Sequence, residues 1–182
     1  MLVTAGWRKN PPPGWFGGVA MIYFASFWFR NLPPGVQRFS VARWQPRELR
    51  PPLPELSFLA PVRKDGGAIV HVPPEQYLDE YAGALRARGR DVAEWLKELD
   101  PAADMALLCW CNKQRQPKPG LLCHTILLGW LVEAARPDVR VAYLDGRDDP
   151  VWGAGDRQRF LRKVAPVLEL CGPASWAALA GC

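Results

Sequence analysis

The amino-acid sequence predicts an α/β fold, in which a mostly parallel sheet with flanking helices forms a single domain. The main observation is that residues 105–144 contain an apolar strand, an apolar helix and a second apolar strand. Two strands joined through one helix are expected to run parallel. The length of 182 residues and the apolar content of 49% suit one ordinary domain with its own core. The third observation is the nineteen prolines, whose main clusters lie early in the chain and predict an irregular N-terminal half.

Residues 1–18 are predicted to form a Pro-rich N-terminal segment, and residues 19–182 the α/β domain. No run reaches the roughly 18 apolar residues that a membrane-spanning helix needs. Charges near the start follow a short apolar stretch instead of preceding it, which differs from a secretory signal peptide. Five cysteines, an odd number, fit a reducing compartment better than a set of disulfides. We therefore expect a cytoplasmic protein with no membrane partner.

The first half of the domain contains two predicted strands and a long irregular segment. Residues 19–29 are rich in apolar and aromatic side chains, as in a buried strand. Residues 36–44 alternate in part between polar and apolar side chains and predict a second strand. Residues 45–61 contain too many prolines for regular structure beyond a short turn.

Two helices are predicted next. Residues 73–89 begin with proline, carry acids in the first turns and arginines in the last, and end at glycine. Residues 91–101 place apolar side chains at helical spacing, and Asp91 is expected to be the N-cap of that helix.

The C-terminal part has the clearest pattern. Residues 105–110 and 139–144 are short apolar runs and predict buried strands. Residues 121–136 predict a helix that is apolar nearly all round, which indicates that it is buried on most sides. Residues 156–170 predict a closing helix.

The expected site lies at one edge of this sheet. In open parallel sheets, ligands bind beyond the carboxyl ends of the strands. Cys109 lies at the carboxyl end of strand 105–110, and the following helix is expected to carry Cys123 and His124 in its first turn. If strand 36–44 is also parallel, the arginines after it leave the sheet at the same edge. The predicted ligand-binding residues are Arg43, Arg47, Cys109, Asp145 and Arg147.

Three interpretations of Cys123 and His124 are open. The first is packing, because a free cysteine is a common core residue. The second is an activated thiolate at Cys123, with His124 as its acid/base partner. A helix N-terminus and nearby cations lower the pKa of a thiol, and residues 111–120 are predicted to form a polar and basic loop.

The third interpretation is a zinc site. The four candidate ligands are Cys109, Cys111, Cys123 and His124. Their types and number suit zinc, but their spacing departs from the usual Cys-x2-Cys and His-x3-His patterns. Neighbouring residues on a helix also point about 100° apart, so ligation by both Cys123 and His124 is expected to be awkward.

Three motifs resemble the YeaO-like family, a widespread prokaryotic domain of unknown function. They are "FSVARWQPR" (39–47), "MALLCW" (105–110) and "LLCHTILLGWL" (121–131). The resemblance covers residues 105–132 well and residues 21–135 loosely. It implies that four residues occupy the family's characteristic positions, namely Arg43, Cys109, Cys123 and His124.

Two departures from the family pattern bear on the chemistry. Thr125 stands where the family usually has arginine, and the positions of Trp110 and Cys111 lack the acidic residue often found near them. The resemblance raises the weight of a functional Cys-His site. The family has no agreed activity that could be carried over to this chain.

The leading hypothesis is a Cys/His/Arg cleft that binds or acts on a phosphate-bearing ligand, such as a nucleotide or nucleic acid. Residues 1–64 hold nine Lys/Arg against two acids, although the whole chain has a net charge of only +5. Arg43 and Arg47 are expected to hold phosphate, with Cys123 as nucleophile or polar contact. No cofactor is required by this hypothesis, and zinc is the alternative.

Two rival classes remain. One is a non-catalytic module that binds single-stranded nucleic acid through the basic N-terminal third and its tryptophans Trp7, Trp15 and Trp44. The other is a docking protein whose tryptophans and prolines contact a protein partner.

Overall fold

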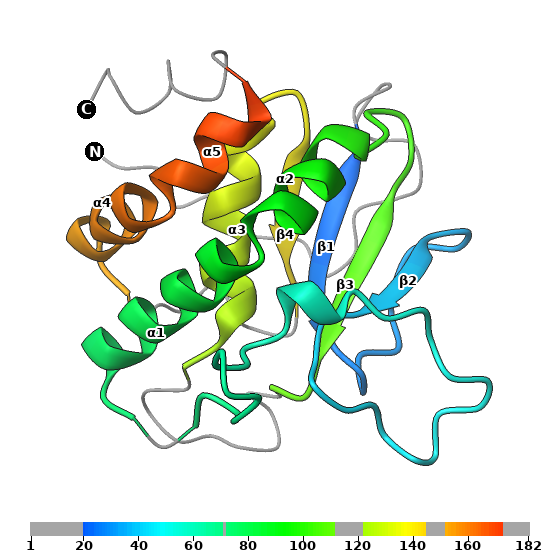
Figure 1. Ribbon diagram of the computed structural model, residues 1–182. Helices are drawn as coiled ribbons and strands as arrows, with labels where there is room; N and C mark the ends of the chain where they lie inside the picture. The colour runs from blue at the N-terminus through cyan, green and yellow to red at the C-terminus, as the bar shows by residue number, and fades with distance from the viewer. Residues whose placement is uncertain (1–19, 71, 112–121, 145–151, 173–182) are drawn as a thin grey trace, which may run out of the picture.

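The computed structural model describes residues 20–70, 72–111, 122–144 and 152–172, and its centre is a four-stranded parallel sheet (Figure 1). The strand order is β2–β3–β1–β4. The strands are β1 (Met21–Ser26), β2 (Gln37–Ser40), β3 (Met105–Cys109) and β4 (Arg140–Tyr143). The predicted α/β class is therefore confirmed. Strands β3 and β4 lie on either side of β1, parallel to it, as expected for the predicted strand–helix–strand unit.

The register brings the carboxyl ends of the strands to one edge. Ser26 of β1 lies opposite Cys109 of β3, and Ser40 of β2 lies opposite Leu108. Strand β2 runs parallel to β3. A parallel direction of this strand was the condition for the prediction that the arginines after it, Arg43 and Arg47, leave the sheet at the same edge as Cys109. The segment after β2 therefore leaves the sheet beside the end of β3.

All described helices pack on one face of the sheet (Figure 1). They are α1 (Pro74–Ala87), α2 (Gly89–Glu98), α3 (His124–Ala135), α4 (Ala154–Lys163) and α5 (Ala165–Cys171), with a short 3-10 helix η1 (Ser57–Leu59). Ile22, Phe24 and Leu107 point into this helix face. Tyr23 and Leu108 point to the other face, because successive side chains of a strand alternate.

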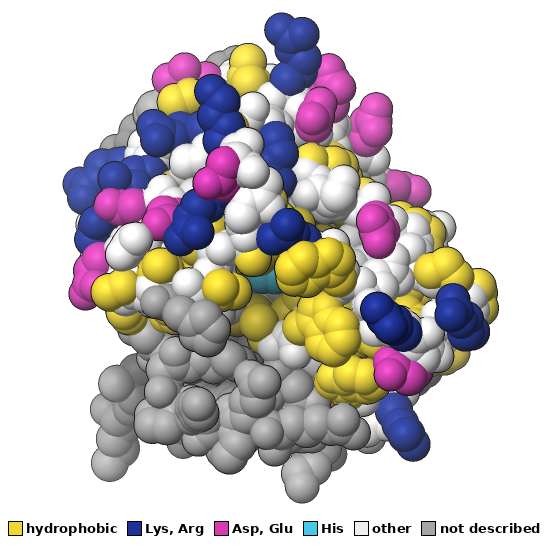
Figure 2. Space-filling view, turned by 60° about the horizontal axis from the view of Figure 1, so that its bottom comes forward, with side chains coloured by type: hydrophobic (Ala, Val, Ile, Leu, Met, Phe, Trp, Pro, Cys, Tyr) yellow, Lys and Arg dark blue, Asp and Glu magenta, His cyan; other side chains and the backbone are white. Residues whose placement is uncertain are grey.

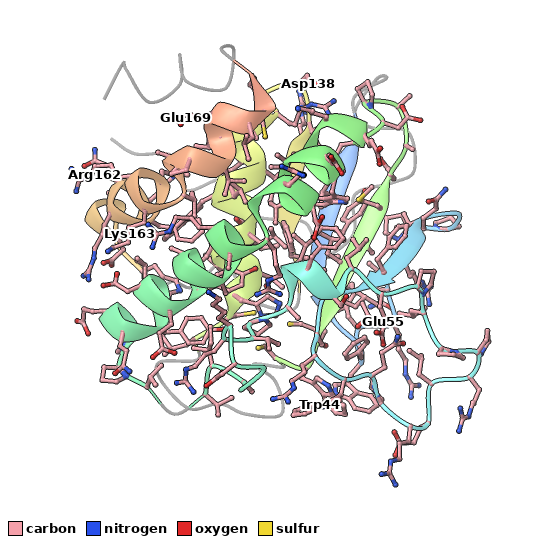
Figure 3. All side chains as sticks on the ribbon, in the orientation of Figure 1. Trp44, Glu55, Asp138, Arg162, Lys163 and Glu169 are labelled. Atoms are coloured by element: carbon pink, nitrogen blue, oxygen red, sulfur yellow. The ribbon has the colours of Figure 1, made fainter. Side chains whose placement is uncertain are left out.

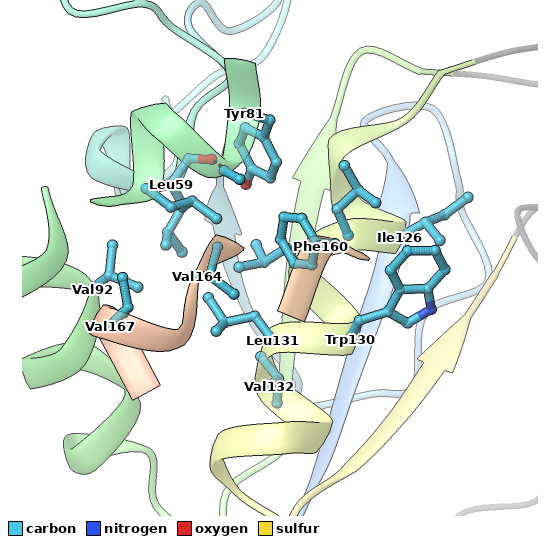
Figure 4. Packing of buried hydrophobic residues seen from close by; sticks show 14 of the residues in the cluster. Leu59, Tyr81, Val92, Ile126, Trp130, Leu131, Val132, Phe160, Val164 and Val167 are labelled. Atoms are coloured by element: carbon cyan, nitrogen blue, oxygen red, sulfur yellow. Dashed lines mark hydrogen bonds between the residues drawn. The ribbon is translucent and has the colours of Figure 1, made fainter. Parts of the chain in front are cut away.

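Helix α3 is buried along almost its whole length, as its apolar sequence predicts. It lies between the sheet and the pair α4 and α5, where Trp130 packs against Phe160 (Figure 4). On the sheet side, a Cβ atom at Gly129 would lie 2.0 Å from the Tyr143 hydroxyl oxygen. Glycine therefore permits the close approach in which Tyr143 donates a hydrogen bond to the Ile126 carbonyl, at 3.3 Å.

Several helix boundaries differ from the sequence prediction, and the differences at α1, α2 and the closing helix are the most informative. Helix α1 ends at Ala87 and α2 begins at Gly89, so the glycine begins the second helix and Asp91 lies in the first turn instead of at the N-cap. The predicted closing helix is two helices with Val164 between them. The break has a physical cause, because Pro166 has no backbone N–H and restricts the residue before it.

The predicted N-terminal segment 1–18 lies outside the described residues. Within the described ranges, no helix is long and apolar enough to cross a membrane.

Candidate metal centre

Four potential metal ligands meet at the carboxyl end of the sheet. Cys109 is the last residue of β3, Cys111 follows two residues later, and Cys123 and His124 stand at the start of α3. The ligand atoms of these four residues all lie within 4.8 Å of one another. Three thiols and an imidazole so close together could hold a metal ion.

The two thiols in the middle of this group are buried and reduced. Cys109 and Cys123 are each 1% exposed, and their sulfur atoms lie 3.7 Å apart, well beyond a disulfide bond. The Cys123 sulfur also lies 2.9 Å from the Thr125 hydroxyl oxygen. Thr125, which stands where the resembled family has arginine, thus contributes a hydroxyl group to the site.

The objection that Cys123 and His124 diverge on a helix is wrong. Cys123 is the N-cap of α3 and has an extended backbone, with φ −114° and ψ 120°. The 100° separation applies only between residues that are both inside a helix, and α3 begins at His124. An N-cap residue ordinarily has this extended conformation, so the two side chains can reach one site.

The His124 ring is held by two segments that are far away in sequence. Its Nε2 lies 3.0 Å from the carbonyl oxygen of Val41, which follows β2, and donates a hydrogen bond to it. The ring of Tyr81 in α1 contacts the imidazole edge to face, with centroids 5.6 Å apart. A neutral imidazole that donates from Nε2 presents Nδ1 as its electron-pair donor, the form that ligates a metal.

The tyrosines of α1 form one wall of the site. Burial, and then the neighbouring Cys111 and Cys123, raise the pKa of Tyr77 well above its usual value. Tyr77 stacks on Tyr81, and the Tyr81 hydroxyl donates a hydrogen bond to the Leu59 carbonyl at 2.9 Å. Both residues belong to an apolar stripe at helical spacing, which also contains Leu78 and Leu85 and is typical of a core-facing helix. That pattern does not reveal that the same stripe borders a cysteine cluster.

Proximity of the thiols affects their protonation. Hydrogen bonds to Cys109 and Cys123, followed by burial and the closeness of the same two sulfurs, raise the pKa of Cys111 well above its usual value. Without a cation, thiols packed this closely favour their neutral form, because each additional negative charge would repel the others.

The predicted arginines lie beside this group, outside it. Arg43 is two residues beyond Val41 and is exposed, with its guanidinium 4.3 Å from the centre of the Trp44 ring. Arg47 is also exposed on the irregular segment after β2. Asp145, Arg147 and residues 112–120 of the predicted basic loop lie outside the described residues.

The carboxyl end of the sheet faces the viewer in Figure 2. There, the histidine colour shows as a small area at the bottom of a hollow, bordered by hydrophobic side chains with cationic side chains nearby. His124 is 3% exposed. The site is therefore an almost closed group beneath a surface of hydrophobic and cationic side chains.

Comparisons of the chain with protein families, with curated proteins and with solved structures found no match. The resemblance to the YeaO-like family stays a prediction.

Proposed function

We propose that the protein is a metal-centre protein, in which Cys109, Cys111, Cys123 and His124 bind zinc. The observation that carries the proposal is the meeting of their four ligand atoms within 4.8 Å. Three sulfurs and one nitrogen are a donor set that selects zinc among common cellular cations, and magnesium and calcium prefer oxygen.

The distances support a tetrahedral site. With zinc–sulfur bonds of about 2.3 Å, two sulfurs of a tetrahedral centre lie about 3.8 Å apart. The Cys109 and Cys123 sulfurs are already 3.7 Å apart. Closing the remaining separations needs side-chain shifts of at most about 1 Å, because no pair exceeds 4.8 Å.

The surroundings support the same proposal. Metal-ligating histidines usually donate their second ring N–H to a carbonyl or carboxylate, which orients the ring. The hydrogen bond from His124 Nε2 to the Val41 carbonyl is a contact of this kind. It would leave Nδ1 of His124 to bind the metal.

Four protein ligands leave no open coordination position, which favours a structural role for the metal. Of the proposed ligands, Cys109 ends β3 and Cys111 follows two residues later. The other two, Cys123 and His124, stand at the start of α3. A bound ion would therefore join the sheet to the N-terminus of its central helix, and would hold the carboxyl end of the fold in place.

Metal analysis of the purified protein tests this proposal. We expect about one zinc per chain, and cobalt-substituted protein should show the visible absorption of tetrahedral cobalt together with thiolate-to-cobalt charge transfer. Cys109→Ser and Cys123→Ser should each lose most of the metal. Cys171→Ser is the matched control, because Cys171 is a free, half-buried cysteine in α5 outside the cluster.

Full-length protein that contains no zinc, and binds neither added zinc nor cobalt, would refute the metal site. So would a Cys171→Ser variant that loses as much metal as the two cluster variants.

The second candidate is the leading sequence hypothesis, a Cys123 thiolate acting on a phosphate-bearing ligand. The position of Cys123 at the start of α3 favours it, because the helix dipole stabilises an anion there. The burial of Cys123 opposes it. Iodoacetamide labelling against pH separates the candidates: a thiolate enzyme labels first at Cys123 near neutral pH, and a metal centre labels at its three cysteines only after chelation.

A further inference from the structure

The surface beside the cysteine cluster exposes aromatic side chains to an unusual degree. In the described part of the chain, four large hydrophobic residues are exposed, and two of them are Trp44 at 60% and Trp110 at 44%. Trp110 lies between Cys109 and Cys111, so this surface adjoins the proposed metal centre. Clustered exposed aromatic residues mark an interaction site more often than isolated ones do.

Contacts between segments hold these aromatic side chains in place. The indole N–H of Trp110 donates a hydrogen bond to the Trp44 backbone carbonyl. Phe27 and Trp28, which follow β1, each meet Trp110 edge to face, with ring centroids 5.8 and 6.0 Å apart. Because these contacts hold the aromatic side chains in place before any ligand binds, less conformational entropy is lost on binding.

Exposed arginines lie close to Trp28 and Trp44 in the sequence, and one of them contacts a tryptophan ring. Arg43 is stacked over the Trp44 ring and, among the described residues, makes no ion pair. Residues 27–54, which supply three of the four aromatic residues, contain five arginines and a single acid, Glu48. A guanidinium that stacks on an aromatic ring keeps its N–H groups available for phosphate.

We infer that the surface formed by Phe27, Trp28, Arg43, Trp44 and Trp110 binds single-stranded nucleic acid. Bases would stack on the exposed faces of Trp44 and Trp110, and backbone phosphates would pair with Arg43 and Arg47. Stacking on tryptophan requires a base whose face is open, as in a single strand but not inside a duplex. Charge complementarity favours single-stranded nucleic acid over an apolar peptide, because an apolar peptide has no negative charges that could pair with the arginines.

Fluorescence anisotropy with a labelled oligothymidylate and the full-length protein tests the inference. All measurements are made in one zinc-containing buffer, so that the result does not depend on the metal proposal. We expect binding to the single strand to be tighter than to a duplex of the same length, and to weaken steeply with salt.

Variants assign the binding to this surface. Trp44→Ala should weaken it about 5- to 150-fold, the range for loss of one stacked base, and leaves the backbone carbonyl that Trp110 uses. Trp44→Phe should recover most of the affinity. Arg43→Ala should reduce the slope of log affinity against log salt by about 0.7, as for one lost phosphate contact on a single strand.

Arg162→Ala is the matched control, because it removes the same charge from an exposed position on α4 (Figure 3). It should leave both the affinity and the salt slope close to those of the unmodified protein. Absence of binding at low salt, equal affinity for the duplex, or equal losses in the Arg43 and Arg162 variants would each overturn the inference.

Discussion

The two ends of the sheet use arginine in opposite ways. At the amino end, Arg136 donates to the Leu96 and Leu99 carbonyls, both at 2.8 Å, and pairs with Asp138 at 2.7 Å. At the carboxyl end, Arg43 rests on an exposed tryptophan and is without a carboxylate partner among the described residues. Figure 3 shows Asp138 and Trp44 at these opposite ends.

The difference indicates that the amino end of the sheet has a structural role and that the carboxyl end carries the candidate site. The donors of Arg136 are used within the fold, where they tie the end of α2 to the turn before β4. At the carboxyl end, the buried groups are thiols and an imidazole, and the exposed groups are aromatic rings and guanidinium. Thiols, an imidazole, exposed aromatic rings and an exposed guanidinium make their strongest interactions when a metal ion or another ligand binds to them.

The largest expected effect is metal removal at the carboxyl end. At a free zinc concentration about 1,000 times the Kd of the proposed site, chelation should lower the free energy of unfolding by about 4 kcal/mol, because a ligand that binds only the folded state stabilises it by this amount. Urea unfolding with and without chelator measures this. Cys123→Ser should be insensitive to the chelator, and equal stability of the unmodified protein under both conditions would contradict the prediction.

Loss of the arginine at the amino end should come next. Arg136→Ala removes the donors of two backbone carbonyls and should lower the free energy of unfolding by about 2–3 kcal/mol. Arg43→Ala, measured in the same urea series, should change it by less than about 0.5 kcal/mol, because Arg43 is exposed. If the two variants are equally destabilised, the contrast between the ends is wrong.

A change in the middle of α3 should have an effect of about 1–3 kcal/mol. Gly129→Ala places a Cβ atom 2.0 Å from the Tyr143 hydroxyl oxygen and 2.7 Å from a ring carbon, so the Tyr143 ring or the elements that carry the two residues must shift. Thermal and urea unfolding measure the loss. Gly155→Ala is the control, because a Cβ atom there meets no atom within 4 Å; similar losses in both variants would show that close packing against Tyr143 is not the cause.

The smallest expected effect is on the pH dependence of stability. The hydrogen bond from Arg136 lowers the pKa of Asp138 below its usual value. Its stabilising contribution is therefore present above the unfolded-state pKa of about 3.9 and is lost as the pH falls through the lower folded-state pKa. Asp138→Asn should be less stable than the unmodified protein near pH 7, with a difference in Tm that shrinks below about pH 4. A difference that does not depend on pH would contradict this assignment.

Sequence patterns located the regular elements well where apolar periodicity is strong. The runs 105–110, 121–136 and 139–144 correspond to β3, α3 and β4, with ends that differ by a few residues. Prediction failed at the ends of helices. There the deciding factors are local backbone conformation, as at Cys123, and the demands of a following element, as at Pro166.

The candidate site was accessible from sequence only in part. Cys109, Cys111, Cys123 and His124 lie close together because one strand, one loop and one helix connect them, and that connection is visible in the chain. The extended conformation of Cys123, which lets it share a site with His124, has no sequence signature that we could identify.

The sequence by itself determined the α/β class and the parallel direction of β3 and β4, and it offered the four clustered residues as one of three interpretations, a possible metal site. These follow from apolar periodicity and short connections, which act between residues close along the chain. Only the tertiary structure decided which groups surround the cluster. The hydrogen bonds from His124 to Val41 and from Trp110 to Trp44 span 83 and 66 residues. They depend on β2 lying beside β3, and strand order is set by packing of the whole sheet and not by the preferences of any one segment.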